Sequence, residues 1–322
     1  MPHVQATKAN RAMLLALVQA ASTAPSSHNS QPWAFRFGHR SIELWADRTR
    51  AMPVVDPQGR ELVISGGAAL FALRAAAARA GFEARVTLLP RGTSSDLLAR
   101  VTLDTQTVDA PEAALADALR ARATWRRAFS PTALPADLTN ALEDAAATEG
   151  AWLDVVPQRQ RPALAGLVTA ADRIHFADPA WRREAASWLH RPTRGDGLRT
   201  RLFAGPPRRL VTTALDLGRP VARRDAELLH DAPLVTVLGT DADGPADWIA
   251  TGQALQRLLL VAARQGVQAG FLNQPCQVPE LRDQLTRMLP PRGFPQMVLR
   301  LGYPDGRRPR SVRRLPEQML RD

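Results

Sequence analysis

Cysteine is almost absent from this chain of 322 residues, since Cys276 is the only one. A single cysteine can form no internal disulfide and cannot supply a cysteine-rich metal site, so the composition favours a reducing cytoplasm. Long apolar runs are also missing. The segment MLLALVQAAS is short and leads into polar residues, so the sequence predicts neither a signal peptide nor a membrane-spanning helix.

Lysine is equally rare, because Lys8 is the only lysine among 42 basic residues, and arginine carries the formal net charge of +11. The arginines are scattered along the chain, and such usage can reflect codon bias. No RNA-binding aromatic motif, zinc-finger spacing or basic heptad accompanies them. Nucleic-acid binding is therefore the least favoured hypothesis, although single arginines can hold a phosphate with two parallel hydrogen bonds.

The 45% of apolar residues is enough to bury a sizeable core, in two domains or in one large domain built from two halves. Apolar periodicity and the positions of Gly and Pro predict helices and strands along the whole chain. Helices are expected at 11–21, 59–80, 111–122, 135–148, 160–190 and 246–265. Strands are expected at 33–37, 41–47, 83–90, 97–104, 151–156, 233–239 and 295–303.

An internal repeat links the two halves. The segment GAALFALRAAAARAGFEA at 67–84 matches GQALQRLLLVAARQGVQA at 252–269 in nine of eighteen positions, at a constant offset of 185. Two alanine-rich helices could match through composition alone. The shared glycines at both ends favour two related halves whose helices pack closely around a pseudo-twofold axis.

Three motifs stand out: the loop APSSHNSQPWAFRF at 24–37, the stretch RATWRRAF at 122–129 and the ending LRLGYPDGRRPRSVRRLP. Together they resemble the flavin-dependent nitroreductase family, most closely its Acg-type single-chain subgroup. The resemblance implies an α+β nitroreductase-like fold, with two unequal fused halves at 1–110 and 111–322 forming a pseudo-dimer around paired central helices. It further implies FMN bound between the halves.

The resemblance also assigns the cofactor-binding positions. The loop would contact the flavin, two arginine-containing segments would hold its phosphate, and the LNQPCQVP stretch at 272–279 would approach its reactive nitrogen. The implied residues are Pro25, Ser26, Ser27, Asn29, Gln31, Arg122, Thr124, Arg126, Gln274, Arg313 and Arg314. Phosphate suits alternating arginines of one extended segment, and the polar edges of a flavin suit side-chain amides. The reciprocal position lacks both motifs, so one flavin per chain is expected.

Each of these residues also has a purely structural interpretation. RATWRRAF could be a solvated run of charges, His28 a loop residue, Trp33 a core anchor and Cys276 a small buried apolar residue. The acidic–glycine step that many nitroreductases carry near the flavin is absent from 272–279. This departure concerns catalysis more than binding, and no catalytic residue or metal ligand is assigned.

The leading functional hypothesis is an FMN-dependent oxidoreductase that passes hydride from NAD(P)H through FMN to a nitroaromatic or quinone-like acceptor. The alternative is an FMN-binding or flavin-sequestering protein with little turnover. Residues 186–228 are predicted to form a lid, because Gly and Pro interrupt a stretch that lacks clear periodicity. We expect the protein to bind small molecules but neither nucleic acid nor membranes, and to be a monomer or a weak homo-oligomer.

Overall fold

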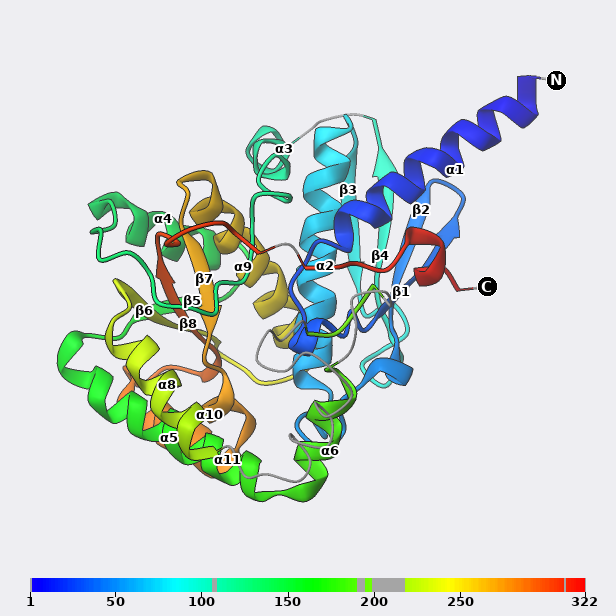
Figure 1. Cartoon of the computed structure of the whole chain (residues 1–322). Helices are drawn as coiled ribbons and strands as arrows, with labels where there is room; N and C mark the ends of the chain where they lie inside the picture. The colour runs from blue at the N-terminus through cyan, green and yellow to red at the C-terminus, as the bar shows by residue number, and fades with distance from the viewer. Residues whose placement is uncertain (1, 106–108, 190–194, 199–217, 310, 322) are drawn as a thin grey trace.

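Two antiparallel sheets flank a pair of central helices in the computed structural model of the chain (Figure 1). The structure describes residues 2–105, 109–189, 195–198, 218–309 and 311–321. The combination of helices with two antiparallel sheets is an α+β architecture, as the sequence predicted.

Both sheets have four strands in the same order. The first sheet runs β1-β2-β4-β3 and the second β5-β6-β8-β7, so each strand of the second sheet takes the place of the strand four earlier in the chain. The first sheet contains β1 (Trp33–Gly38), β2 (Ser41–Ala46), β3 (Glu83–Leu88) and β4 (Leu97–Asp104). The second contains β5 (Trp152–Val155), β6 (Leu234–Thr240), β7 (Gln268–Phe271) and β8 (Phe294–Gly302).

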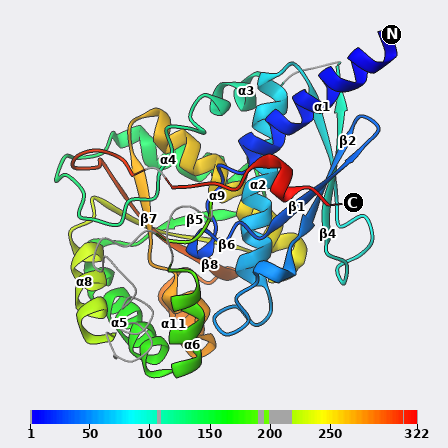
Figure 2. The same cartoon turned by 45° about the vertical axis from the view of Figure 1, so that its right-hand side comes forward.

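The helices cover these sheets on several sides (Figures 1 and 2). The α-helices are α1 (Pro2–Ala21), α2 (Arg60–Arg79), α3 (Ala110–Ala116), α4 (Ala136–Ala147), α5 (Arg161–Ala177), α6 (Pro179–Ser187), α8 (Gly218–His230), α9 (Pro245–Arg264), α10 (Gln274–Gln277) and α11 (Pro279–Met288). Short 3-10 turns lie at η1 (Ser27–Asn29), η2 (Arg48–Arg50), η3 (Gln158–Gln160) and η5 (Pro316–Met319).

The central helices α2 and α9 cross where the repeated glycines meet. A Cβ atom added to Gly67 would lie 2.3 Å from the carbonyl oxygen of Ile249, and one added to Gly252 would lie 2.1 Å from that of Ile64. Neither position therefore has room for a side chain, and the absence of one lets the backbones touch. The two glycines are 185 positions apart, so the repeat found in the sequence marks this crossing.

Helix α2 is long and apolar enough to cross a membrane by length and composition, but 89% of its most apolar stretch is buried inside the protein. It packs on the first sheet and on α9, as the core helix of a globular protein does. Trp33 is fully buried in the same core, so its interpretation as a core anchor is confirmed.

The second sheet is buried on both faces, which explains why β6 has no exposed residue. Helices α4 and α9 pack on one face, and α5, α8 and α11 pack on the other. This second layer of helices lies along the lower edge of the molecule in Figure 1. It forms one wall of the cavity described below.

The C-terminal segment returns to the first half of the chain. Leu320 forms a parallel bridge with Phe35 of β1, and Arg321 donates its backbone N–H to the carbonyl of Phe35 at 2.9 Å. Figure 2 shows η5 beside α1 and β1. Residues 311–314 thereby come next to the loop that follows α1.

Several predicted elements differ from the structure. The helix expected at 111–122 ends at Ala116, and the one expected at 160–190 is two helices, because Asp178 leaves helical geometry and caps α6. Of the predicted lid, residues 190–194 and 199–217 lie outside the described residues. Residues 218–228, expected to be irregular, belong to α8. The short β7, α10 and α11 had no prediction.

Candidate functional site

The loop after α1 is held in an unusual backbone conformation. His28, Asn29 and Gln31 have φ angles of 52°, 56° and 52°, in the left-handed region that residues with a Cβ rarely adopt. Such conformations persist where the surrounding contacts impose them, and they concentrate at functional sites. Inside the loop, the backbone N–H of Gln31 donates to Ser26 Oγ at 3.0 Å.

The C-terminal segment supplies further contacts that fix the loop. Arg313 Nη1 donates to Asn29 Oδ1 at 2.8 Å, and the backbone N–H of Arg314 donates to Gln31 Oε1 at 3.0 Å. Asn29 Nδ2 donates in return to the carbonyl of Val312 at 3.1 Å. The loop and the C-terminal arginines, predicted to share one site, are therefore in direct contact.

Residues 195–198 lie against the same loop and against the C-terminal segment, since a Cβ atom added to Gly195 would lie 2.8 Å from the carbonyl oxygen of Arg313. Asn29 Nδ2 also donates to the carbonyl of Gly197, and Gln31 Nε2 donates to that of Gly195 at 2.9 Å. Asp196 forms an ion pair with Arg50. The two amides predicted to contact a flavin thus hold neighbouring chain segments, and neither lines the cavity.

A cavity of about 470 Å³ opens beside this loop, within the usual size range of ligand pockets. Its walls come from η1, the 124–126 segment, α2, α5, α6, α8, α10 and the second sheet. Six of the predicted site residues line it: Pro25, Ser26, Ser27, Thr124, Arg126 and Gln274. The others, Asn29, Gln31, Arg122, Arg313 and Arg314, lie outside the lining.

The RATWRRAF stretch reaches the cavity because it pairs with the edge of the second sheet. Thr124 forms a parallel bridge with Ala269 of β7, and the backbone N–H of Trp125 donates to the carbonyl of Ala269 at 2.8 Å. Trp125 and Arg122 are buried, whereas Arg126 is solvent-accessible. The stretch is therefore only partly a solvated run of charges.

Arg122, Arg126 and Arg313 form a cluster of like charges. Burial, followed by the charges of Arg313 and Arg126, lowers the pKa of Arg122 to about 9, and burial followed by Arg126 lowers that of Arg313 to about 10. None of the three takes part in an ion pair among the described residues. Within the same residues, Nε and Nη1 of Arg122 and Nε of Arg313 have no hydrogen-bond partner.

Buried donors and charges are normally paired, so this cluster fits an anion. A phosphate dianion would supply the missing negative charge and acceptor oxygens. His28, half-buried in the cavity wall, adds no charge at neutral pH, because burial and then Arg126 lower its pKa to about 4.

Carboxyl groups gather elsewhere in the cavity wall. Gln274 Nε2 donates to Asp225 Oδ2 of α8 at 2.8 Å and to Asp172 Oδ1 of α5 at 3.2 Å. Burial, and then Asp225, raises the pKa of Asp172 to about 7. His175 follows one turn later on α5, and burial lowers its pKa to about 4. The sequence analysis included Gln274 but missed Asp172, His175 and Asp225. The available signal was the polar pair Asp172 and His175, three positions apart in an otherwise apolar helix.

Glu61 of α2 joins two predicted segments from the opposite side. Ser27 Oγ donates to Glu61 Oε2, and Gln277 Nε2 donates to Glu61 Oε1 at 2.8 Å. Nearby Cys276 is buried, and burial raises the pKa of its thiol to about 11. Cys276 is therefore a buried thiol, as its structural interpretation predicted. No group of three or more His, Cys, Asp or Glu that could hold a metal ion occurs within the residues described.

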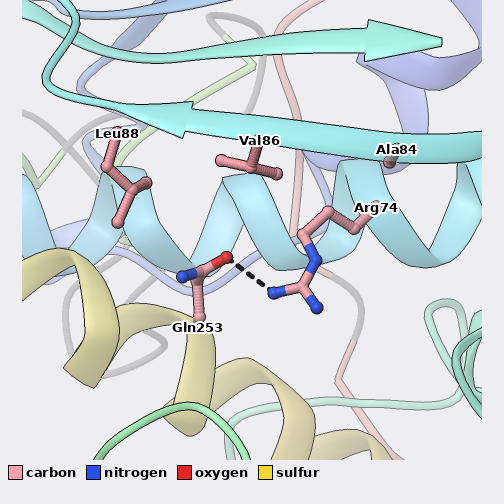
Figure 3. A pocket seen from close by; sticks show the side chains of 5 residues that line it. All are labelled: Arg74, Ala84, Val86, Leu88 and Gln253. Carbon is pink, nitrogen blue, oxygen red and sulfur yellow. Dashed lines mark hydrogen bonds between the residues drawn. The ribbon is translucent and has the colours of Figure 1, made fainter.

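A second hollow, of about 270 Å³, lies between β3 and the central helices (Figure 3). Arg74 and Gln253 point toward each other there, and Arg74 Nη1 donates to Gln253 Oε1 at 2.8 Å. Arg74 is also ion-paired with Glu112 and Glu149. Because this arginine is already neutralised, the second hollow does not call for an anion as the first one does.

No family model matches the chain, but it is similar over most of its length to curated proteins named as nitroreductases. The chain is 30% identical over 323 residues to "Putative NAD(P)H nitroreductase Rv3131" of Mycobacterium tuberculosis, covering 92% of this chain and 90% of that protein. It is 32% identical over 300 residues to the uncharacterized protein Rv3127 of the same organism, covering 90% and 86%. The protein named "Putative NAD(P)H nitroreductase acg" is 28% identical over 295 residues, covering 88% and 87%.

Solved structures give weaker likenesses. A nitroreductase with bound FMN from Bacteroides fragilis has a TM-score of 0.41 and 17% identity, covering 62% of this chain and 94% of that one. The FMN-dependent nitroreductase NfnB from Mycobacterium smegmatis, in complex with NADPH, has a TM-score of 0.39 and 20% identity, with coverages of 62% and 94%. These values are too low to locate a ligand in this chain.

Proposed function

The chain belongs to the nitroreductase family, and on that premise we propose that it is an FMN-binding oxidoreductase. It takes hydride from NAD(P)H and passes it to a nitroaromatic or quinone-like acceptor. The names of the relatives support the nicotinamide and the reaction class. The observation that carries FMN binding is the cluster of Arg122, Arg126 and Arg313, which holds unpartnered donors beside a ligand-sized cavity.

In this proposal the arginine cluster holds the FMN phosphate, and Pro25, Ser26, Ser27 and Thr124 border the rest of the cofactor. Arg314, Asn29 and Gln31 support the site from behind through their contacts with the loop and its neighbours. When bound, FMN supplies the capacity to accept and release a hydride. The protein's part is orientation, charge compensation and control of access.

Fusion of two nitroreductase-like halves also belongs to the proposal. The identical strand order of the two sheets and the contact between Gly67 and Gly252 support it. Other features of the proposal remain predictions: the boundary between the halves near residue 110, one flavin per chain, a cytoplasmic location, and a monomer or weak homo-oligomer.

The protein's absorption spectrum tests FMN binding directly. After reconstitution with FMN and desalting, the purified protein should retain roughly one flavin per chain and show a flavin spectrum. The same preparation with NADH or NADPH and a quinone should then oxidise the nicotinamide. Retention of no flavin, or equal retention of riboflavin, would contradict the phosphate site.

Flavin sequestration is the second candidate, and one observation favours it. Residues 195–198 are tied to the loop by hydrogen bonds from Asn29 and Gln31 and by the ion pair between Asp196 and Arg50, and Leu198 lines the cavity. A segment anchored in this way would restrict the entry of nicotinamide. Full FMN retention with no nicotinamide oxidation would identify a sequestering protein.

A further inference from the structure

Four buried polar atoms around the carboxyl-containing wall of the cavity lack a partner among the described residues. They are Oδ2 of Asp172, Nδ1 of His175, Oε1 of Gln274 and Nε of Arg300, and all four residues line the cavity. Asp172 is 3% exposed and His175 is 6% exposed, so water satisfies these atoms poorly. Unpaired buried polar atoms in a cavity wall indicate that a ligand with polar groups binds there.

The environment of Asp172 favours its neutral acid. Burial raises its pKa to about 7, and the negative charge of Asp225 acts in the same direction, while the hydrogen bond from Gln274 opposes both. The other titratable or charged groups that line the cavity are Arg224 of α8, Arg300 of β8 and, across the cavity, Glu61 of α2, His28 of η1 and Arg126. His175 carries no charge at neutral pH, because its pKa lies at about 4.

The wall beside Asp172 also suits a flat ligand. The His175 ring stacks on Trp181 with 5.1 Å between centroids and an angle of 4° between planes, and Phe176 packs against the same indole. All three aromatic residues line the cavity. An aromatic surface next to a carboxylic acid fits a planar molecule that carries an oxygen acceptor.

Resting on the proposed function, we propose that Asp172 hydrogen-bonds to a carbonyl oxygen of a quinone acceptor and donates the proton that completes its reduction. The quinone gains one hydride from the reduced cofactor, which brings two electrons and one proton. The O–H bond of Asp172 breaks, and its proton joins the quinone oxygen to give the hydroquinone. The Asp172 carboxylate then recovers a proton from solvent, so the cycle balances.

Binding of a quinone in the absence of any reductant tests the contact without turnover. The probe is tetramethyl-1,4-benzoquinone, which carries no titrating group, and calorimetry measures its Kd from pH 5 to pH 9 on both the FMN-free and the FMN-loaded oxidised protein. Wild-type affinity should fall roughly tenfold as pH rises through 7, because the carboxylate no longer donates. Using both forms keeps this test independent of FMN binding.

Variants assign the pH dependence to Asp172. Asp172→Asn keeps a neutral donor and should bind the quinone at all pH values about as tightly as wild type at pH 5, whereas Asp172→Ala should bind weakly throughout. Asp225→Asn removes the neighbouring charge and should move the transition to lower pH. Glu227→Gln, on the exposed side of α8, is the matched control and should leave the profile unchanged.

Turnover separates a proton donor from a group that only binds. The amide of Asp172→Asn donates a hydrogen bond but no usable proton, so kcat should fall roughly 10²- to 10⁴-fold while KM stays close to the wild-type value. Unchanged kcat in this variant, or a pH transition that survives in it, would overturn the proposal. A wild type that holds FMN but never reduces the quinone would refute the reductase and the proton transfer, whereas pH-dependent binding would still identify the oxygen subsite.

Discussion

Replacing Arg122 with methionine should weaken FMN binding without weakening the protein itself. The side chain of Arg122 is buried and makes one hydrogen bond to the described residues, from Nη2 to the carbonyl of Thr23 at 3.0 Å. Its Nε and Nη1 have no partner among those residues. Each hydrogen bond to a charged group contributes about 1.5–3 kcal/mol. Loss of one phosphate contact should therefore reduce FMN affinity roughly ten- to hundredfold.

The free energy of unfolding of the FMN-free variant should not fall along with its FMN affinity. Burial and two neighbouring arginines lower the pKa of Arg122 to about 9, so folding holds this charge at an unfavourable position when no anion is present. Methionine removes the charge at similar length and leaves no large void. The FMN-free variant should be as stable as the wild type or more so, because an unpaired buried charge destabilises the folded state.

The assay compares two ligands and a control variant. Fluorescence titration gives Kd for FMN and for riboflavin, which lacks the phosphate, and urea unfolding of the FMN-free protein gives the stability. Riboflavin binding should be nearly unchanged in Arg122→Met. Arg79→Ala is the matched control, since this arginine is exposed and pairs with Asp117. If FMN and riboflavin weaken equally, or if the variant unfolds much more easily without ligand, Arg122 is a structural residue and the reasoning fails.

Three further outcomes follow. Gly67→Ala should lower the free energy of unfolding in urea by about 1–3 kcal/mol, because the new Cβ would lie 2.3 Å from the Ile249 carbonyl oxygen. The control Gly166→Ala in α5 has open space around the new Cβ and should stabilise the protein slightly. Equal effects of the two changes would refute the close crossing of α2 and α9. Because the pKa of Asp172 is raised, the folded protein binds this proton more tightly than the unfolded protein does, so the free energy of unfolding should fall as pH rises from about 4 to 7. Asp172→Asn should remove this part of the fall. If the dependence of stability on pH is the same in the variant, Asp172 is not a buried acid. Iodoacetamide should label Cys276 slowly at pH 8 and quickly in urea, whereas fast labelling of folded protein would show an accessible thiol.

The central crossing was predictable because the sequence pattern itself carries its cause. A repeat at a constant offset, with glycines at matched positions, predicts that two helices pack closely against each other. The structure places Gly67 and Gly252 at that approach. The strands from 33 to 47 were equally predictable, since alternating apolar residues flank a short turn in which Arg40 takes a φ of 54°.

The positions of the side chains in the site were less predictable, because they depend on contacts between distant segments. Asn29 and Gln31 are polar residues in a motif, and nothing local shows that the C-terminal segment and residues 195–198 use their amides. Asp172 was missed for the same reason. Its raised pKa arises from burial and from Asp225 on another helix, and neither is visible in the sequence around it.

Several unfavourable features of this protein lie around one cavity. The loop after α1 holds His28, Asn29 and Gln31 in left-handed backbone conformations, and the arginine cluster places like charges together without a described counter-charge. Asp172 and its neighbours leave buried polar atoms open to the same cavity. By contrast, Arg74 beside the second hollow is neutralised by Glu112 and Glu149. Because folding alone favours none of these features, their grouping around one cavity supports the proposed cofactor, which is anionic at its phosphate and planar at its flavin ring.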